Sequence, residues 1–181
     1  MGLGPSLQEV EMNDWNKCIE FHGHECPGLA LGYRAALLVI KELGIDRSED
    51  EEIVCVSENT ACGVDSIQVM LACTAGKGNL IFRKVGKHAY SFFDRKTGRS
   101  IRIVTRSFDR SGGRDKTLKW VLSAPDEEIF LVKSPEYGMP AEAEIVESIV
   151  CENCGESASE DNIRIRKGKR LCLDCMDSQC L

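Results

Sequence analysis

"CPGLALGYRAALLVIKELG", residues 26–44, has the apolar spacing of a long amphipathic helix. Its apolar residues recur three or four positions apart, at Leu29, Tyr33, Ala36, Leu37 and Ile40. Pro27 suits the first turn of a helix, and Gly44 supplies a stop at its C-terminal end. The stretch therefore predicts a helix over residues 27–43 that packs one face against a core.

The segments around this helix alternate between helical and strand patterns, which predicts an α+β fold. Helices are expected over residues 13–20, 59–74 (capped by Thr60) and 115–123, and strands over 51–58, 80–85, 88–94, 100–106 and 128–133. The three runs from Leu80 onward are typical of an antiparallel meander. This order of elements predicts a layered structure with about five strands flanked by helices.

The chain of 181 residues is long enough for one well-packed domain and a small second one. "SPEYGMP", residues 134–140, interrupts the pattern, and we expect a first domain over 1–148 and a second over 149–181. The second segment is too short to bury a useful core by itself. It therefore needs a covalent or metal crosslink.

Four cysteines in the second segment have the spacing of a zinc site. Cys151-x2-Cys154 is followed, 17 residues later, by Cys172-x2-Cys175. Two disulfides or surplus core cysteines are the alternative, but the pattern of a reducing compartment favours metal ligation. A site closed by four thiolates is structural. Between the pairs, "NIRIRKGKRLC" predicts a hairpin that turns at Lys167-Gly168.

A second candidate site lies in "FHGHECPG", residues 21–28. In an extended conformation, which Pro27 favours, His22, His24 and Cys26 would point to one side. In a helix only His22 and Cys26 would share a face. In either case at least two metal-ligating side chains converge.

Cys62 has the same relation to a helix as Cys26, because each precedes a predicted helix N-terminus, where the helix dipole favours a thiolate. Asp65 follows Cys62 by one turn. Two such cysteines and two histidines can form an open metal site or a reactive thiol site. Capping, packing and a buried free cysteine remain the alternatives. His88 has no neighbouring candidate ligand in the sequence and is not assigned to a site.

The overall composition is that of an ordinary globular protein, with 43% hydrophobic and 29% charged residues. The net charge of -6 disfavours generic nucleic-acid binding. No apolar run approaches the roughly 20 residues of a membrane span, and no signal peptide is recognisable. We expect a cytoplasmic protein.

"FHGHECPGLALGYRAA" (21–36), "ENTACGVDSIQVMLACTAGKGNL" (58–80) and the terminal four-cysteine segment together resemble the FmdE family of formylmethanofuran dehydrogenase subunits. The resemblance implies a thioredoxin-like mixed sheet, a homodimer and a C-terminal treble-clef zinc finger. It also implies a metal-binding active site built from His22, His24, Cys26 and Cys62, with Asp65 and Glu58 as neighbours.

The resemblance further implies a role accessory to molybdenum or tungsten formylmethanofuran dehydrogenase, or to a related anaerobic pathway, with the subunits of that enzyme as partners. One structural Zn²⁺ and a second divalent metal in the first domain are the expected cofactors. If the open site is catalytic, its metal would act on a carbonyl or on water, with Cys62, His24, Cys26 and Asp65 as its residues. The alternatives are a thiol-redox protein that cycles Cys26 and Cys62, or a dimeric scaffold that docks through its finger.

Overall fold

The computed structural model describes residues 7–177, with side chains from residue 13 onward. The chain forms two compact units, Met1–Glu142 (unit 1) and Ala143–Leu181 (unit 2). Of the ten cysteines, Cys180 lies outside the described residues.

Unit 1 is built on a five-stranded mixed sheet with the order β2-β1-β3-β4-β5. Its strands are β1 (Ile53–Ser57), β2 (Leu80–Phe82), β3 (Ala89–Asp94), β4 (Ser100–Thr105) and β5 (Phe130–Lys133). The β1–β2 pair is parallel, and the other pairs are antiparallel. This sheet and the helices beside it confirm the predicted α+β class.

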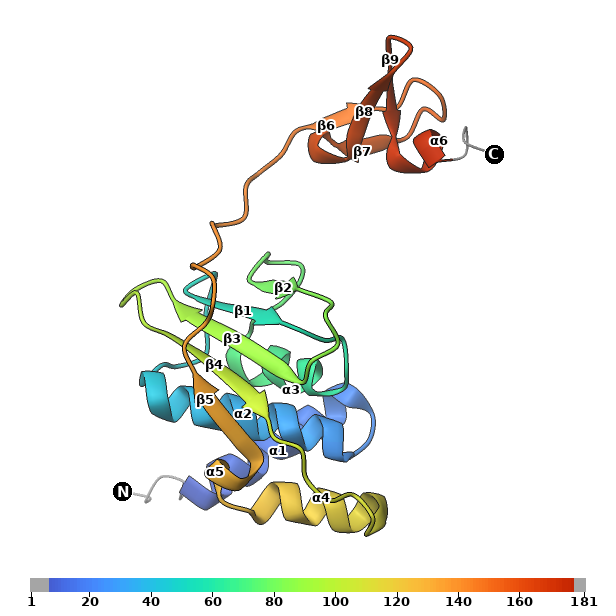
Figure 1. Ribbon diagram of the computed structural model, residues 1–181. Helices are drawn as coiled ribbons and strands as arrows, with labels where there is room; N and C mark the ends of the chain where they lie inside the picture. The colour runs from blue at the N-terminus through green and yellow to red at the C-terminus, as the bar shows by residue number, and fades with distance from the viewer. Residues whose placement is uncertain (1–6, 178–181) are drawn as a thin grey trace, which may run out of the picture. The chain divides into compact units, whose positions relative to one another are not determined.

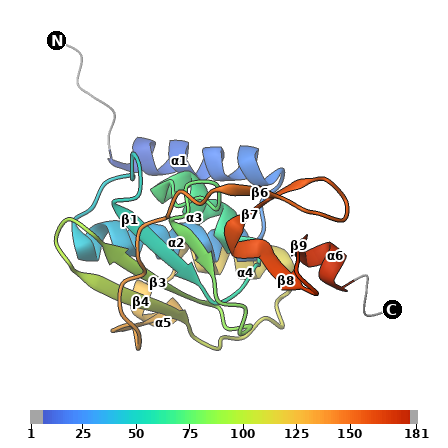
Figure 2. The ribbon, with the colours of Figure 1, turned by 90° about the horizontal axis from the view of Figure 1, so that it is seen from above.

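Helices cover one face of this sheet, where they form the main core with β1, β3 and β4 (Figures 1 and 2). They are α1 (Leu7–His22), α2 (Pro27–Leu43), α3 (Gly63–Leu71), α4 (Gly113–Ser123) and the short α5 (Asp126–Ile129). The bounds of α2 are those predicted, with Pro27 in its first turn and Gly44 in the left-handed conformation at its end. No helix within residues 7–177 is long and apolar enough to cross a membrane.

The predicted antiparallel meander is wrong for its first strand. β2 pairs in parallel with β1, and β1 separates it from β3. The reason is the helix between β1 and β2. A helical connection carries the chain back to the starting end of the sheet, so that the next strand runs parallel.

Two helix starts differ from the predicted ones. α3 begins at Gly63 and not after Thr60, because the Asn59 side chain accepts the Ala61 N–H at 2.9 Å and closes a turn first. This turn makes Cys62 the N-terminal cap of α3. α1 begins at Leu7, six residues earlier than the predicted start.

The tightest contact in unit 1 lies between α2 and α3, at Gly32 and Gly63. A Cβ atom at Gly32 would lie 2.0 Å from the Gly63 carbonyl oxygen, and one at Gly63 would lie 3.1 Å from the Gly32 Cα. The Ser66 hydroxyl donates to the Leu29 carbonyl at 2.8 Å across the same interface. Glycine at both positions therefore lets the two helix backbones touch.

The opposite face of the sheet carries a smaller core of Val54, Val56 and Phe93. The segment after β5 crosses this face (Figure 1), and the Tyr137 hydroxyl donates to Ser91 Oγ at 2.9 Å. Arg95 holds the end of the segment through the carbonyls of Pro140 and Ala141, both at 2.8 Å.

Unit 2 contains two short hairpins and a helix, and its core is small. The elements are β6 (Ser148–Val150), β7 (Ser157–Ser159), a 3-10 turn (Glu160–Asn162), β8 (Ile163–Arg166), β9 (Lys169–Cys172) and α6 (Leu173–Asp177). Lys167 and Gly168 both have positive φ angles, 51° and 76°, at the β8–β9 turn. These values confirm the hairpin that the sequence predicts.

The glycine contact predicts a large effect of Gly32→Ala. The added methyl group would meet backbone atoms of α3, which cannot rotate away as a side chain can, so the two helices must separate. We expect unit 1 to lose about 3 kcal/mol or more of its unfolding free energy. Both tryptophans, Trp15 and Trp120, lie in unit 1. Urea unfolding followed by tryptophan fluorescence therefore reports on this unit alone.

Gly76→Ala is the matched control, because a Cβ atom there would have no heavy atom within 4 Å. Its urea midpoint should stay within the change typical of a surface substitution, about 0.5 kcal/mol. Equal midpoints for Gly32→Ala and the wild type would contradict the close approach of α2 and α3.

Candidate functional site

His22, His24 and Cys26 lie together at the junction of α1 and α2. α1 ends at His22, and Gly23, with a φ angle of +90°, turns the chain while its N–H donates to the Ile19 carbonyl at 2.7 Å. Cys26 caps α2, and its Sγ accepts the Leu29 N–H at 3.3 Å. The helix end and the cap thus hold the first and last of the three side chains.

The ligating atoms of His22, His24 and Cys26 all lie within 4.8 Å of one another. His22 Nε2 is 3.8 Å from Cys26 Sγ, and the two imidazole centroids are 4.6 Å apart. A tetrahedral zinc ion with ordinary Zn–N and Zn–S bonds would separate these two atoms by about 3.5 Å. The three side chains therefore fit one metal ion and leave room for a fourth ligand.

Asp65 orients His22 from α3. The two atoms His22 Nδ1 and Asp65 Oδ2 are 2.7 Å apart, and Gln68 donates to the other Asp65 oxygen at 3.3 Å. Because an ionised carboxylate only accepts, Nδ1 carries the proton and the lone pair of Nε2 faces Cys26. Carboxylate, histidine and metal form the same series in many metal sites. Asp65 is thus a positioning residue.

Cys62 reaches the same place from the N-terminal end of α3, although it is not part of the three-residue cluster within the described residues. A Cβ atom at Gly28 would lie 3.6 Å from Cys62 Sγ and 3.8 Å from Cys26 Sγ. Gly28 therefore leaves the space that both thiols face. Burial, followed by the neighbouring Cys26 thiol, raises the pKa of Cys62.

The four cysteines of unit 2 form the second cluster. Their sulfur atoms all lie within 4.8 Å of one another, and the sulfurs of Cys154 and Cys172 are 3.9 Å apart. The edge of a tetrahedral four-thiolate zinc site is about 3.8 Å, from a Zn–S bond of about 2.3 Å. The four side chains therefore fit a closed metal site.

Backbone geometry prepares both halves of this cluster. Cys151 lies directly after β6, and Gly155, with a φ angle of +78°, donates to the Cys151 carbonyl at 2.9 Å and closes the first turn. Cys172 ends β9, and Cys175 lies in α6. Backbone N–H groups, first that of Cys154, lower the pKa of the Cys151 thiol to about 6.

A cavity of about 240 Å³ opens beside the first cluster, and it contains residues that sequence reasoning missed. Gly28 lines it together with His88, Arg110 and Arg114. His88 is far from any candidate ligand in the sequence, and only the pairing of β3 with β4 brings it toward α4. A short basic run around residue 110 was the available signal.

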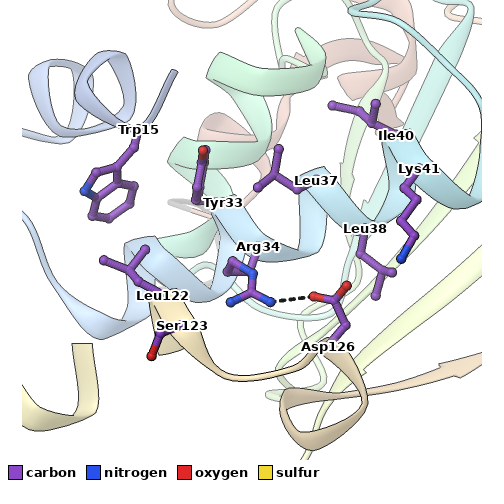
Figure 3. Close-up of a pocket in the computed structure, with 10 residues that line it drawn as sticks. All are labelled: Trp15, Tyr33, Arg34, Leu37, Leu38, Ile40, Lys41, Leu122, Ser123 and Asp126. Carbon is purple, nitrogen blue, oxygen red and sulfur yellow. Dashed lines mark hydrogen bonds and ion pairs between the residues drawn. The ribbon is translucent and has the colours of Figure 1, made fainter. Parts of the chain in front are cut away.

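A larger cavity of about 850 Å³ lies between α1, α2 and α4 (Figure 3). Its principal charged pair is satisfied, because Arg34 binds Asp126 at 2.6 Å and the carbonyls of Val121 and Ala124 at 2.8 Å. Arg34 thus fastens the end of α4 to α2. The clustered metal-ligating side chains lie outside this cavity.

The sequence profile of the family described as "FmdE, Molybdenum formylmethanofuran dehydrogenase operon" matches residues 21–131. The matched segment is more than half of the chain and includes all three residues of the first cluster. The chain belongs to the FmdE family. The four cysteines of unit 2 lie outside the matched FmdE segment.

Two known proteins resemble this FmdE chain over most of its length. A "Probable S-adenosyl-L-methionine-binding protein" of Archaeoglobus fulgidus is 30% identical over 191 residues, which cover 88% of this chain and 51% of that protein. The chain thus spans about half the length of this relative. The crystal structure of an FmdE-like protein of tungsten formylmethanofuran dehydrogenase, from Syntrophus aciditrophicus, matches with a TM-score of 0.66, 20% identity and 94% coverage of both chains. That match shows the fold.

Glu58 of the FmdE segment is committed to a buried ion pair. Both of its carboxylate oxygens accept from Arg102, at 2.7 and 3.0 Å, and Glu58 is 2% exposed. The structure therefore gives Glu58 a role different from that of a neighbour of the His/Cys cluster. The pair joins β4 to the end of β1, just before the Asn59 turn that leads to Cys62.

This ion pair predicts a loss of stability in acid. Hydrogen bonds from Arg102 lower the pKa of Glu58 in the folded state, relative to about 4.3 in the unfolded chain. The pair therefore stabilises the fold above pH ~4.3, and this contribution disappears as the pH falls through the lowered value. Glu58→Gln should cost about 3 kcal/mol at pH 7 and flatten the decline of stability in acid, measured by urea unfolding at several pH values.

The slope should flatten only in part, since a hydrogen bond from Ser48 lowers the pKa of Glu52 to about 2. Replacing both partners, Glu58→Leu with Arg102→Met, should cost less than Glu58→Gln, because no buried charge is left alone. An acid slope identical to that of the wild type in Glu58→Gln would rule out this pair as a source of the pH dependence.

Proposed function

We propose that this FmdE-family chain is a two-site metal protein, with an open and functional site in unit 1 and a structural zinc site in unit 2. The observation that carries the proposal is the convergence of His22, His24 and Cys26, whose ligating atoms lie within 4.8 Å of one another. Three protein ligands with one position left open are typical of catalytic metal sites.

In this proposal His22, His24 and Cys26 hold the metal, and Cys62 stands at the open side. A divalent metal bound there would supply Lewis-acid chemistry toward a carbonyl or water. The chain's own residues supply orientation. Asp65 holds the His22 proton on Nδ1, and the space at Gly28 gives access to both thiols.

The proposal assigns zinc to Cys151, Cys154, Cys172 and Cys175, and a treble-clef fold to residues 149–181 as a domain separate from 1–148. Support comes from the four-thiol set and from the order of turn, hairpin and helix. Thiol-rich sites of this kind persist in a reducing compartment, which favours the cytoplasm.

The family membership supports a role accessory to formylmethanofuran dehydrogenase, with the other chains of that enzyme as partners. A homodimer and a thioredoxin-like sheet, which the resemblance implies, belong to the proposal as well. S-adenosyl-L-methionine binding, named for the Archaeoglobus fulgidus relative, is left to that longer protein.

The adjacency of Cys26 and Cys62 also favours a second candidate function, a thiol pair that cycles between dithiol and disulfide. Such pairs are activated by a lowered thiol pKa. Burial and the Cys26 thiol instead raise the pKa of Cys62, which favours the metal site.

Metal content per chain tests the proposal. Elemental analysis of protein purified without oxygen should find two metal ions in the wild type and one in Cys26→Ala, because one of three ligands is lost. Cys73→Ala is the matched control, since Cys73 is a buried cysteine outside both clusters, and this variant should retain two metal ions.

Asp65→Asn tests the positioning role within the same experiment. It leaves every proposed ligand in place, and we expect the metal affinity of unit 1 to fall by about 10- to 100-fold. A single metal ion in the wild type and in Cys26→Ala alike would refute the open site and favour the thiol pair. A Cys26–Cys62 crosslink trapped at oxidising potential would then be required.

Metal removal should unfold unit 2 selectively. Its buried core consists mainly of Cys151, Leu171 and Cys175, so without a metal little apolar area holds it together. A strong chelator should abolish the protection of amides in residues 148–177 from hydrogen exchange and leave tryptophan fluorescence, which reports on unit 1, unchanged. Protected amides in a metal-free sample would show that the metal is dispensable for this fold.

A further inference from the structure

The cavity of about 240 Å³ in unit 1 has a lining that combines positive charge with an apolar wall. Its basic and imidazole side chains are Arg110, Arg114 and His88, and its apolar wall includes Leu31 and Phe108. These residues come from α2, the start of β3, the β4–α4 loop and α4. The cavity therefore depends on the tertiary fold of unit 1.

Neither arginine is neutralised by a carboxylate of the described chain, 7–177. Arg110 lies over the Phe108 ring, with Cζ 4.9 Å from the centroid, and Arg114 donates to the carbonyl oxygen of Glu25 at 2.6 Å. In contrast, Arg34 and Arg102 are each paired with a carboxylate. No acidic side chain lines the cavity, so two positive charges converge on it without a counter-ion from the chain.

The cavity ends at the two thiols of the first cluster. Gly28 forms part of its wall, and a Cβ atom at Gly28 would lie within 3.8 Å of both Cys26 Sγ and Cys62 Sγ. Arg114 also touches the loop of that cluster, since it binds the carbonyl of Glu25. A ligand in this cavity can therefore reach from the arginines to the thiols.

We propose that this cavity binds a small organic carboxylate, with its carboxylate on Arg110 and Arg114 and its body between Leu31 and Phe108. The far end of the ligand then lies over Gly28, facing the metal site, and for that end alone the inference rests on the proposed function.

The shape and chemistry of the lining select this class of ligand. Arginine offers paired N–H donors that match the two oxygens of a carboxylate. The Phe108 ring and Leu31 offer an apolar surface that an inorganic anion cannot use. The volume lies below the range of drug-sized ligand sites, about 300–1,000 Å³, which limits the ligand to a small acid.

Benzoate is a suitable probe, with benzamide as its neutral counterpart and inorganic phosphate as an anion without an apolar body. Titration of the full-length protein, followed through the backbone amides of Gly28 and Gly113 by NMR, should give saturable shifts with benzoate and much weaker ones with benzamide and phosphate. Arg110→Gln should raise the Kd for benzoate by about tenfold or more. Arg114→Gln should do the same.

Lys119→Gln is the matched control, because it removes one positive charge from α4 outside the cavity, and it should leave the Kd unchanged. Equal benzoate binding by the wild type and Arg110→Gln would overturn the proposal. So would equal affinity for benzoate and phosphate, or no saturable binding in the wild type.

Metal content measured on the same samples separates the two proposals. Carboxylate binding with only one metal ion per chain would support the cavity and refute the open metal site. Two metal ions without carboxylate binding would do the reverse. Unchanged thermal unfolding of the arginine variants excludes misfolding as the cause of a lost signal.

Discussion

The contact of α2 with α3 at Gly32 and Gly63 is the constraint on which the rest of unit 1 depends. A helix pair usually stands 8–10 Å apart at the side chains, whereas two facing glycines let the backbones meet. The Ser66 hydrogen bond to Leu29 fixes this approach. Because Cys26 and Cys62 cap these same two helices, the close contact also brings their thiols to one place.

Around that point the polar groups are distributed according to task. His22 and Asp65 form a pair in which the carboxylate fixes a proton and leaves one nitrogen free for a metal. Glu58 and Arg102 form a pair that is closed to solvent and ligands, and it anchors the strand end before the Asn59 turn. Arg110 and Arg114 retain their charge beside the cavity. Function is thus concentrated where charges are left uncompensated.

The two units use cysteine in opposite ways. In unit 2 four thiols close around one position, and backbone N–H groups favour the thiolate at Cys151. In unit 1 the histidines and Cys26 leave one side open, and burial keeps Cys62 protonated when no metal is present. A closed set stabilises a small fold, while an open set gives a ligand access.

Local patterns by themselves determined the helix over 27–43, the hairpin turn at Lys167-Gly168 and the two pairs of cysteines, because each depends on neighbours in the sequence. The α+β class followed from the same patterns. Only the tertiary structure decided the parallel pairing of β2, the pairing of Asp65 with His22, and the meeting of His88, Arg110 and Gly28 at one cavity. These contacts join residues more than 20 positions apart, and side-chain periodicity carries no information about which distant segments meet.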